Sequence, residues 1–148
     1  MVGAGCYRHQ GANSETIKNI LDVFPYWFHP RFQQFVGKVD RLPFDQHIVK
    51  ALVAPRALLS TEALGNLWAN PEGTQMTYLA AREVYRFLKA EERIGIWFRE
   101  GGYAHTLADR QAVLDFADWH LLGKPRARAF DQLAFPNLKP IYTWHAPS

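Results

Sequence analysis

The middle and later parts of the chain alternate between short apolar runs and longer amphipathic segments. The compact apolar run at residues 56–61 predicts a strand, and the run at residues 94–98 predicts a second one. Apolar residues recur at helical spacing over residues 70–89 and 107–122, which predicts a helix after each strand. The order strand, helix, strand, helix favours parallel pairing with a right-handed crossover, and therefore an α/β fold.

Start and stop signals support both helices. The run Asn70-Pro71-Glu72 supplies a cap, a proline at the first helical position and an acid in the first turn. Thr106 and Asp109 fit a capping box for the last helix, which ends at Gly123. The expected buried stripe of the first helix is Met76, Leu79, Ala80, Val84, Phe87 and Leu88. The apolar positions of the last helix are Leu114, Ala117 and Leu121.

The first third of the chain predicts shorter elements. Asn13 can cap a helix over residues 14–23, and a short amphipathic helix is expected over residues 30–36. Asp45 can cap a third helix, which breaks at the run Ala54-Pro55.

Two strands alone leave both edges of a sheet open and each face half covered, so the predicted sheet is incomplete. We interpret residues 1–123 as part of one α/β domain. Residues 124–148 contain four prolines and one tryptophan and show little periodicity, and we expect them to form an extended tail packed on that domain.

Composition narrows the choice of function. The 148 residues are 48% apolar and 21% charged, which is typical of a globular protein, and the net charge of +3 is spread along the chain. No basic patch favours nucleic acid, and no apolar run reaches the length of a membrane span. Cys6 is the single cysteine, which excludes an intramolecular disulfide and a cysteine-based zinc site. The histidines show no metal-ligand spacing, so neither a metal nor a cofactor is expected. We recognise no signal peptide, and localisation is left open.

A histidine in the glycine-rich segment 101–106 follows the second predicted strand. Open parallel sheets gather catalytic groups at that edge, and the histidine of an α/β-hydrolase triad comes last in chain order. Together with several other segments, this one resembles the glucuronoyl esterases, the family 15 carbohydrate esterases, across nearly all of residues 1–123. The segments that carry the resemblance are Gly3-Ala4-Gly5, Gly11-Ala12-Asn13, Leu42-Pro43-Phe44-Asp45-Gln46-His47, Leu52-Val53-Ala54-Pro55-Arg56, Leu67-Trp68-Ala69-Asn70-Pro71-Glu72-Gly73 and Gly101-Gly102-Tyr103-Ala104-His105-Thr106.

The resemblance implies the C-terminal part of an α/β-hydrolase with a serine-esterase mechanism. His105 matches the general base, and the alternative is a loop histidine hydrogen-bonded near a helix start. Trp68 matches the tryptophan that lines the sugar pocket, and core packing is its alternative. Glu15 matches a polar residue that contacts substrate, often glutamine in the family, and its alternative is a surface glutamate in the first turn of a helix.

The catalytic acid and the nucleophile are harder to place. The family's acid matches Met1 in one branch and Asn66 in another, and neither side chain is a carboxylate, which leaves Glu62 as the candidate acid. Ser14, Ser60 and Ser148 lack the glycine-flanked elbow of a nucleophilic serine. We expect Trp68 and His105 to share one concave surface, with Asn66 and Glu62 nearby and His105 exposed.

The resemblance therefore implies part of an enzyme that hydrolyses glucuronic acid esters linking xylan to lignin, inactive as the chain stands. Its partner would be a small-molecule or polysaccharide ester resembling glucuronoxylan. Two alternatives remain open. One is a non-catalytic remnant that binds a glycan or a partner, either a second copy or the missing N-terminal half. The other is an esterase for a different ester, such as acetylated xylan.

Overall fold

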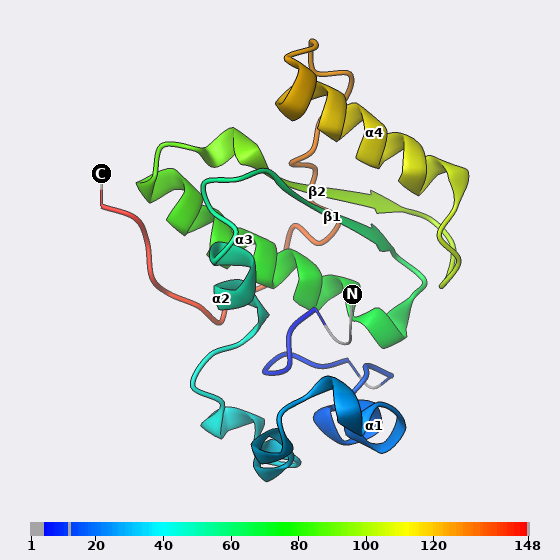
Figure 1. Ribbon diagram of the computed structural model, residues 1–148, viewed down its shortest axis with the longest axis vertical. Helices are drawn as coiled ribbons and strands as arrows, with labels where there is room; N and C mark the ends of the chain where they lie inside the picture. Colours follow the sequence, from blue (N-terminus) through cyan, green and yellow to red (C-terminus); the bar gives the residue numbers. More distant parts are fainter. Residues whose placement is uncertain (1–4, 12, 148) are drawn as a thin grey trace.

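The computed structural model describes residues 5–11 and 13–147 and has an α/β arrangement (Figure 1). The helices are α1 (Ile17–Val23), α2 (Gln46–Ala51), α3 (Pro71–Phe87) and α4 (Leu107–Leu122). The strands are β1 (Leu58–Ala63) and β2 (Ile94–Arg99). Short 3-10 helices lie in the connecting segments. Helices α3 and α2 cover one face of the sheet and α4 covers the other, so the layers are helix, sheet, helix.

The two strands pair in parallel, which confirms the predicted topology. The register runs from Leu58 opposite Ile94 to Ala63 opposite Arg99, and α3 connects the two strands. Strand β1 begins and ends two residues later than predicted. The Arg56 N–H donates to Val53 O in a turn at 3.0 Å, and the Tyr85 hydroxyl donates to Arg56 O at 2.9 Å. The backbone of Arg56 is therefore not available to the sheet.

The helix α3 buries a different stripe from the predicted one. Tyr78, Ala81 and Tyr85 pack against Ile94 and Ile96 of β2. Of the residues expected in the stripe, Met76 is buried, but Phe87 is 58% exposed and Leu88 is 44% exposed. The predicted stripe left out the tyrosines that the buried face carries, and one of them, Tyr85, keeps a polar partner by donating its hydroxyl to Arg56 O.

The opposite face of the sheet is packed by α4 and by a residue of the tail. Phe116 of α4 and Phe130 of the tail form a cluster that includes Leu59 and Trp97 from the strands. A Cβ at Gly95 would lie 2.9 Å from the Phe116 ring and 3.1 Å from the Cβ of Phe130, so glycine allows both rings to sit on the strand. Leu114 and Leu121 are among the predicted apolar positions of α4, but they lie outside this core and are largely exposed.

The tail runs along the free edge of β2. The Ile96 N–H donates to Phe130 O at 2.7 Å, and Asp131 forms a parallel bridge with Ile96. Further along, the Gln75 side chain of α3 bonds to the backbone of Ala134 and Phe135. The tail is extended and packed, and the division of the chain between residues 123 and 124 stays a prediction. No helix of the described ranges is long and apolar enough to cross a membrane.

The helix α1 starts three residues later than predicted. Its N-cap is Thr16, which forms a capping box with Asn19, so the prediction of Asn13 as the cap is wrong. The Ser14 hydroxyl accepts from the Gly11 N–H at 3.0 Å, and the Glu15 N–H donates to Trp68 O at 3.0 Å. Residues 14 and 15 are thereby held in a loop.

Asp45 fixes the N-terminal segment against the rest of the chain. Its carboxylate caps α2 by accepting from Gln46 N–H at 2.7 Å, as predicted. The same carboxylate accepts from Tyr7 N–H at 3.1 Å and from Arg8 N–H at 2.8 Å. Asp45 is only 3% exposed, so these donors would lack partners without it.

We therefore predict that Asp45→Ala lowers the free energy of unfolding by about 3 kcal/mol, because three backbone donors lose a charged acceptor. Urea denaturation of the purified chain measures this value. Asp40→Ala is the matched control, because Asp40 is exposed, and it should change stability by less than about 0.5 kcal/mol. Equal effects of the two substitutions would contradict the role given to Asp45.

Candidate active site

The candidate site is the C-terminal edge of the sheet, meaning residues 64–69 after β1 and residues 100–106 after β2 (Figure 1). The two segments stay paired beyond the strands. Leu64 N–H donates to Arg99 O at 2.8 Å, and Gly65 N–H donates to Gly101 O at 2.9 Å. A Cβ at Gly65 would lie 2.6 Å from Gly101 O, so this close approach requires glycine.

An ion pair holds the loop that carries His105. Arg99 Nε lies 2.6 Å from Asp109 Oδ2, and both side chains are largely buried. The guanidinium also donates to the carbonyls of Gly102 and Ala104, and the Asp109 carboxylate accepts from Thr106 N–H at 2.6 Å. Burial alone would raise the pKa of Asp109, but the Thr106 donors and Arg99 outweigh it and lower that pKa. The strand end, the loop and the start of α4 are thus joined through one carboxylate.

His105 is exposed on this loop, as predicted from the sequence. Its ring makes no hydrogen bond to any other residue that the structure describes. The neighbouring Tyr103 is 86% exposed, and it has no such bond within that part of the chain either. The loop therefore presents both rings to solvent.

Trp68 and Glu15 are brought together by the structure. Trp68 lies in the short 3-10 helix Leu67–Ala69, and its Nε1–H donates to Glu15 Oε1 at 3.1 Å. Trp68 is 47% exposed, whereas Glu15 is 7% exposed, and Glu15 Oε2 is buried without a partner among the described residues. Burial raises the pKa of Glu15, and the bond from Trp68 opposes that rise. The sequence identified the two residues separately and missed their contact, because 53 positions separate them.

Glu62 lies in β1 and faces α3. Its Oε1 accepts from the Thr74 hydroxyl at 2.8 Å, and no hydrogen bond joins it to His105 in the described ranges. Burial raises the pKa of Glu62, while Thr74 and Lys50 act in the opposite direction. Asn66, the other position considered for the acid, begins the 3-10 helix that carries Trp68, as its N-cap residue.

Lys50 completes this buried polar cluster, and sequence reasoning missed it. Its Nζ donates to Thr74 O at 3.1 Å and to the Thr77 hydroxyl at 2.9 Å. Burial lowers the pKa of Lys50 to about 8, although Glu62 works against that fall. A lysine on a six-residue helix gives no sequence signal of burial, so only the fold reveals it.

The residues that the structure describes contain no group of three or more histidine, cysteine, aspartate or glutamate side chains able to hold a metal ion.

Comparison with known proteins identifies the family of this chain. The family model described as glucuronyl esterase, fungi, matches residues 1–89. The chain is 36% identical over 124 residues to carbohydrate esterase MZ0003 from an unknown prokaryotic organism, covering 74% of this chain and 29% of that protein. The chain therefore belongs to the glucuronoyl esterase family.

Solved structures show the same relationship. A family 15 glucuronoyl esterase from Caldicellulosiruptor kristjansonii superposes with a TM-score of 0.87 at 33% identity, over 96% of this chain and 40% of that one. A mutant glucuronoyl esterase from Sporotrichum thermophile, solved with methyl 4-O-methyl-β-D-glucopyranuronate, gives 0.70 at 26% identity, over 81% of this chain and 34% of that one. The expected partial α/β-hydrolase fold is thus confirmed, and the chain spans less than half the length of these relatives.

The buried Lys50 predicts a measurable pH dependence of stability. Its folded pKa of about 8 lies below the ordinary 10.5, so the unfolded chain binds more protons between these values. The contribution of Lys50 to the unfolding free energy should therefore rise by about 2 kcal/mol from pH 7.5 to pH 9.5. In Lys50→Met this rise should be missing, as measured by urea unfolding at both pH values. Lys38→Met, at an exposed lysine, should keep the wild-type rise, and a wild-type rise in Lys50→Met would refute the assignment.

Proposed function

We propose that this chain supplies the general base and part of the sugar pocket of a serine-type glucuronoyl esterase. The observation that carries the proposal is the match of 96% of the chain to a solved glucuronoyl esterase, with His105 presented at the C-terminal edge. The chain spans 40% of that relative and carries no recognisable nucleophile elbow. A base without its nucleophile cannot form an acyl-enzyme, so the chain as given does not turn over esters.

His105 would act on a serine supplied by the rest of the domain. The imidazole would take the proton from the serine hydroxyl as it attacks the ester carbonyl, and would return it to the leaving alcohol. Exposure of His105 on a loop held by Arg99 and Asp109 supports this role, because the base must be accessible yet fixed in place. That Glu62 is the acid partner of His105 remains a prediction. It requires the Glu62 carboxylate, which faces α3, to reach the His105 ring.

Trp68 and Glu15 would contact the sugar of the substrate. The Trp68 N–H is already bonded to Glu15, so the exposed part of the indole offers its apolar ring to a pyranose. Glu15 Oε2 is buried without a partner among the described residues, so a sugar hydroxyl would reach it only after a local movement of the loop. The substrate would be an ester of (4-O-methyl-)glucuronic acid on a glucuronoxylan-like polysaccharide. An acetyl ester remains the alternative within the same mechanism.

The partner of this chain would be the remaining, nucleophile-bearing part of such a domain. Exposed apolar residues on α4 favour a covering partner, whether that part or a second copy: Leu107, Leu114, Leu121 and Leu122. A glycan-binding remnant without catalysis stays the competing function.

The proposal predicts inactivity in isolation and activity on completion. The purified 148-residue chain should not hydrolyse benzyl glucuronate, whereas a chimera that places the preceding part of a glucuronoyl esterase before residue 5 should hydrolyse it. His105→Ala should lower kcat of the chimera about 1,000-fold or more, consistent with loss of a triad member. Tyr103→Ala, at the neighbouring exposed ring, should leave kcat within about threefold. Turnover by the isolated chain, or an active His105→Ala chimera, would contradict the proposal.

In the same chimera, Trp68→Ala should raise KM about tenfold with little change in kcat. The ring would bind the sugar equally in the ground and transition states, and tenfold corresponds to about 1.4 kcal/mol. Trp27→Ala is the matched control, because Trp27 is 48% exposed and belongs to a different 3-10 helix, Pro25–Trp27. An unchanged KM in Trp68→Ala would remove Trp68 from the pocket.

A further inference from the structure

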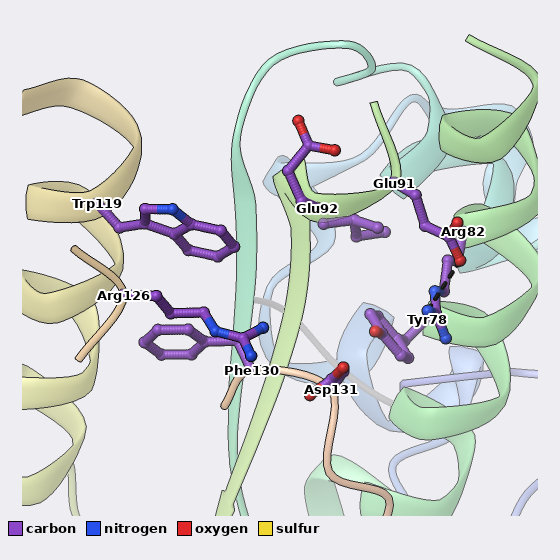
Figure 2. Close-up of a pocket in the computed structure, with 9 residues that line it drawn as sticks. Tyr78, Arg82, Glu91, Glu92, Trp119, Arg126, Phe130 and Asp131 are labelled. Carbon is purple, nitrogen blue, oxygen red and sulfur yellow. Dashed lines mark ion pairs between the residues drawn. The ribbon is translucent and has the colours of Figure 1, made fainter. Parts of the chain in front are cut away.

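A second cavity lies at the opposite end of the sheet from the candidate active site. It encloses about 300 Å³ where β2 begins at Ile94, between α3, α4 and the first part of the tail. Figure 2 shows Trp119 and Arg126 on the α4 side of this cavity and Tyr78 and Arg82 on the α3 side. The volume is at the lower end of the range typical of small-ligand sites, about 300–1,000 Å³. We call it the β2-start cavity.

One side of the β2-start cavity is aromatic and rigid. Trp119 packs with its ring nearly parallel to that of Phe130, at an angle of 11° and a centroid distance of 6.4 Å. The Arg126 guanidinium carbon lies 5.6 Å from the centre of the Trp119 ring. Phe130 is itself held by the backbone bond to Ile96. The aromatic wall is therefore fixed by the core and by the sheet edge, which limits the entropy lost when a ligand binds.

The other walls carry hydrogen-bonding groups of both charges. Arg82 and Glu91 satisfy each other at 2.8 Å, as the dashed line in Figure 2 marks. Arg126 and Asp131 have no ion-pair partner among the residues that the structure describes, and both are exposed. Tyr78 contributes a hydroxyl that burial keeps in its neutral form by raising its pKa. The cavity thus offers free donors and free acceptors beside an apolar ring.

This combination selects for a neutral polyhydroxylated ligand. Arg82 is paired with Glu91, and Glu92 lies 3.9 Å from Arg93. The lining charges left over are Arg126 and Asp131, which are of opposite sign, so the cavity has little net charge to attract an anion. The same balance gives a cation no net attraction, because Arg126 offsets Asp131. A sugar ring can donate a hydroxyl to Asp131, accept from Arg126, and lay its C–H face on the part of the half-buried Trp119 ring that Arg126 leaves open.

We propose that the β2-start cavity is a binding site for a neutral pyranose, such as a xylose unit of a polysaccharide. The six residues of β2 span roughly 17 Å, so this site is separate from the C-terminal edge that carries His105. Binding there requires neither His105 nor a nucleophile. The proposal stands or falls independently of the esterase function.

Indole N–H resonances of the 148-residue chain test the proposal directly. The chain has five tryptophans, and substituting each with phenylalanine in turn assigns the five signals in an ¹H–¹⁵N spectrum. Titration with xylotriose should shift the Trp119 signal in a saturable manner, with millimolar affinity, and leave Trp144 unchanged. The same concentration of inorganic phosphate should leave the Trp119 signal in place. A Trp119 shift with phosphate but not with xylotriose would overturn the choice of ligand.

Two substitutions outside the core then locate the site. Asp131→Asn and Arg126→Gln should each weaken xylotriose binding at least fivefold, because each removes a charged hydrogen-bonding group from the cavity. Asp40→Asn and Arg110→Gln, at exposed positions outside the cavity, should keep the wild-type affinity. Unchanged melting temperatures would show that all four variants fold. Wild-type affinity in both cavity variants, or shifts confined to Trp68, would refute the site.

Discussion

The arrangement of the candidate site depends on backbone pairing that continues past the ends of β1 and β2. Adjacent parallel strands end at the same edge of a sheet. Here Leu64 and Gly65 remain bonded to Arg99 and Gly101, at 2.8 and 2.9 Å. The segment that leads to Trp68 and the loop that carries His105 therefore leave the sheet from one fixed point, although 37 positions separate the two residues.

Buried polar groups then attach the N-terminal third of the chain to this frame. Asn70 adopts a left-handed conformation at φ 60°, caps α3 by accepting from Gly73 N–H, and donates to the carbonyls of Cys6 and His9. Asp45 binds the same segment from the side of α2. Such groups are costly to bury unless they are satisfied, so their bonds determine which loop conformation is stable. The Trp68–Glu15 contact is a consequence of that attachment.

The sequence was sufficient for features set by local chemistry. The strands, the caps at Asn70 and Thr106 and the parallel order follow from apolar runs and capping residues, and the structure confirms them. Features set by tertiary contact were missed. The start of α1 moved because the Glu15 backbone bonds to Trp68. The side chain of Glu62 faces α3, and Lys50 is buried against α3. The sequence around each residue gives no sign of either contact.

Hydrogen exchange of the Leu64 and Gly65 amides tests most directly whether the pairing beyond the strands exists. Both amides lie in a loop, and loop amides without hydrogen bonds exchange rapidly with solvent. Protection of these amides therefore requires the bonds to Arg99 and Gly101. The account predicts that these two amides are protected nearly as strongly as Ile96 within β2, whose N–H is bonded to Phe130. Exchange of Leu64 and Gly65 at the rate of an unstructured peptide, with Ile96 still protected, would contradict it.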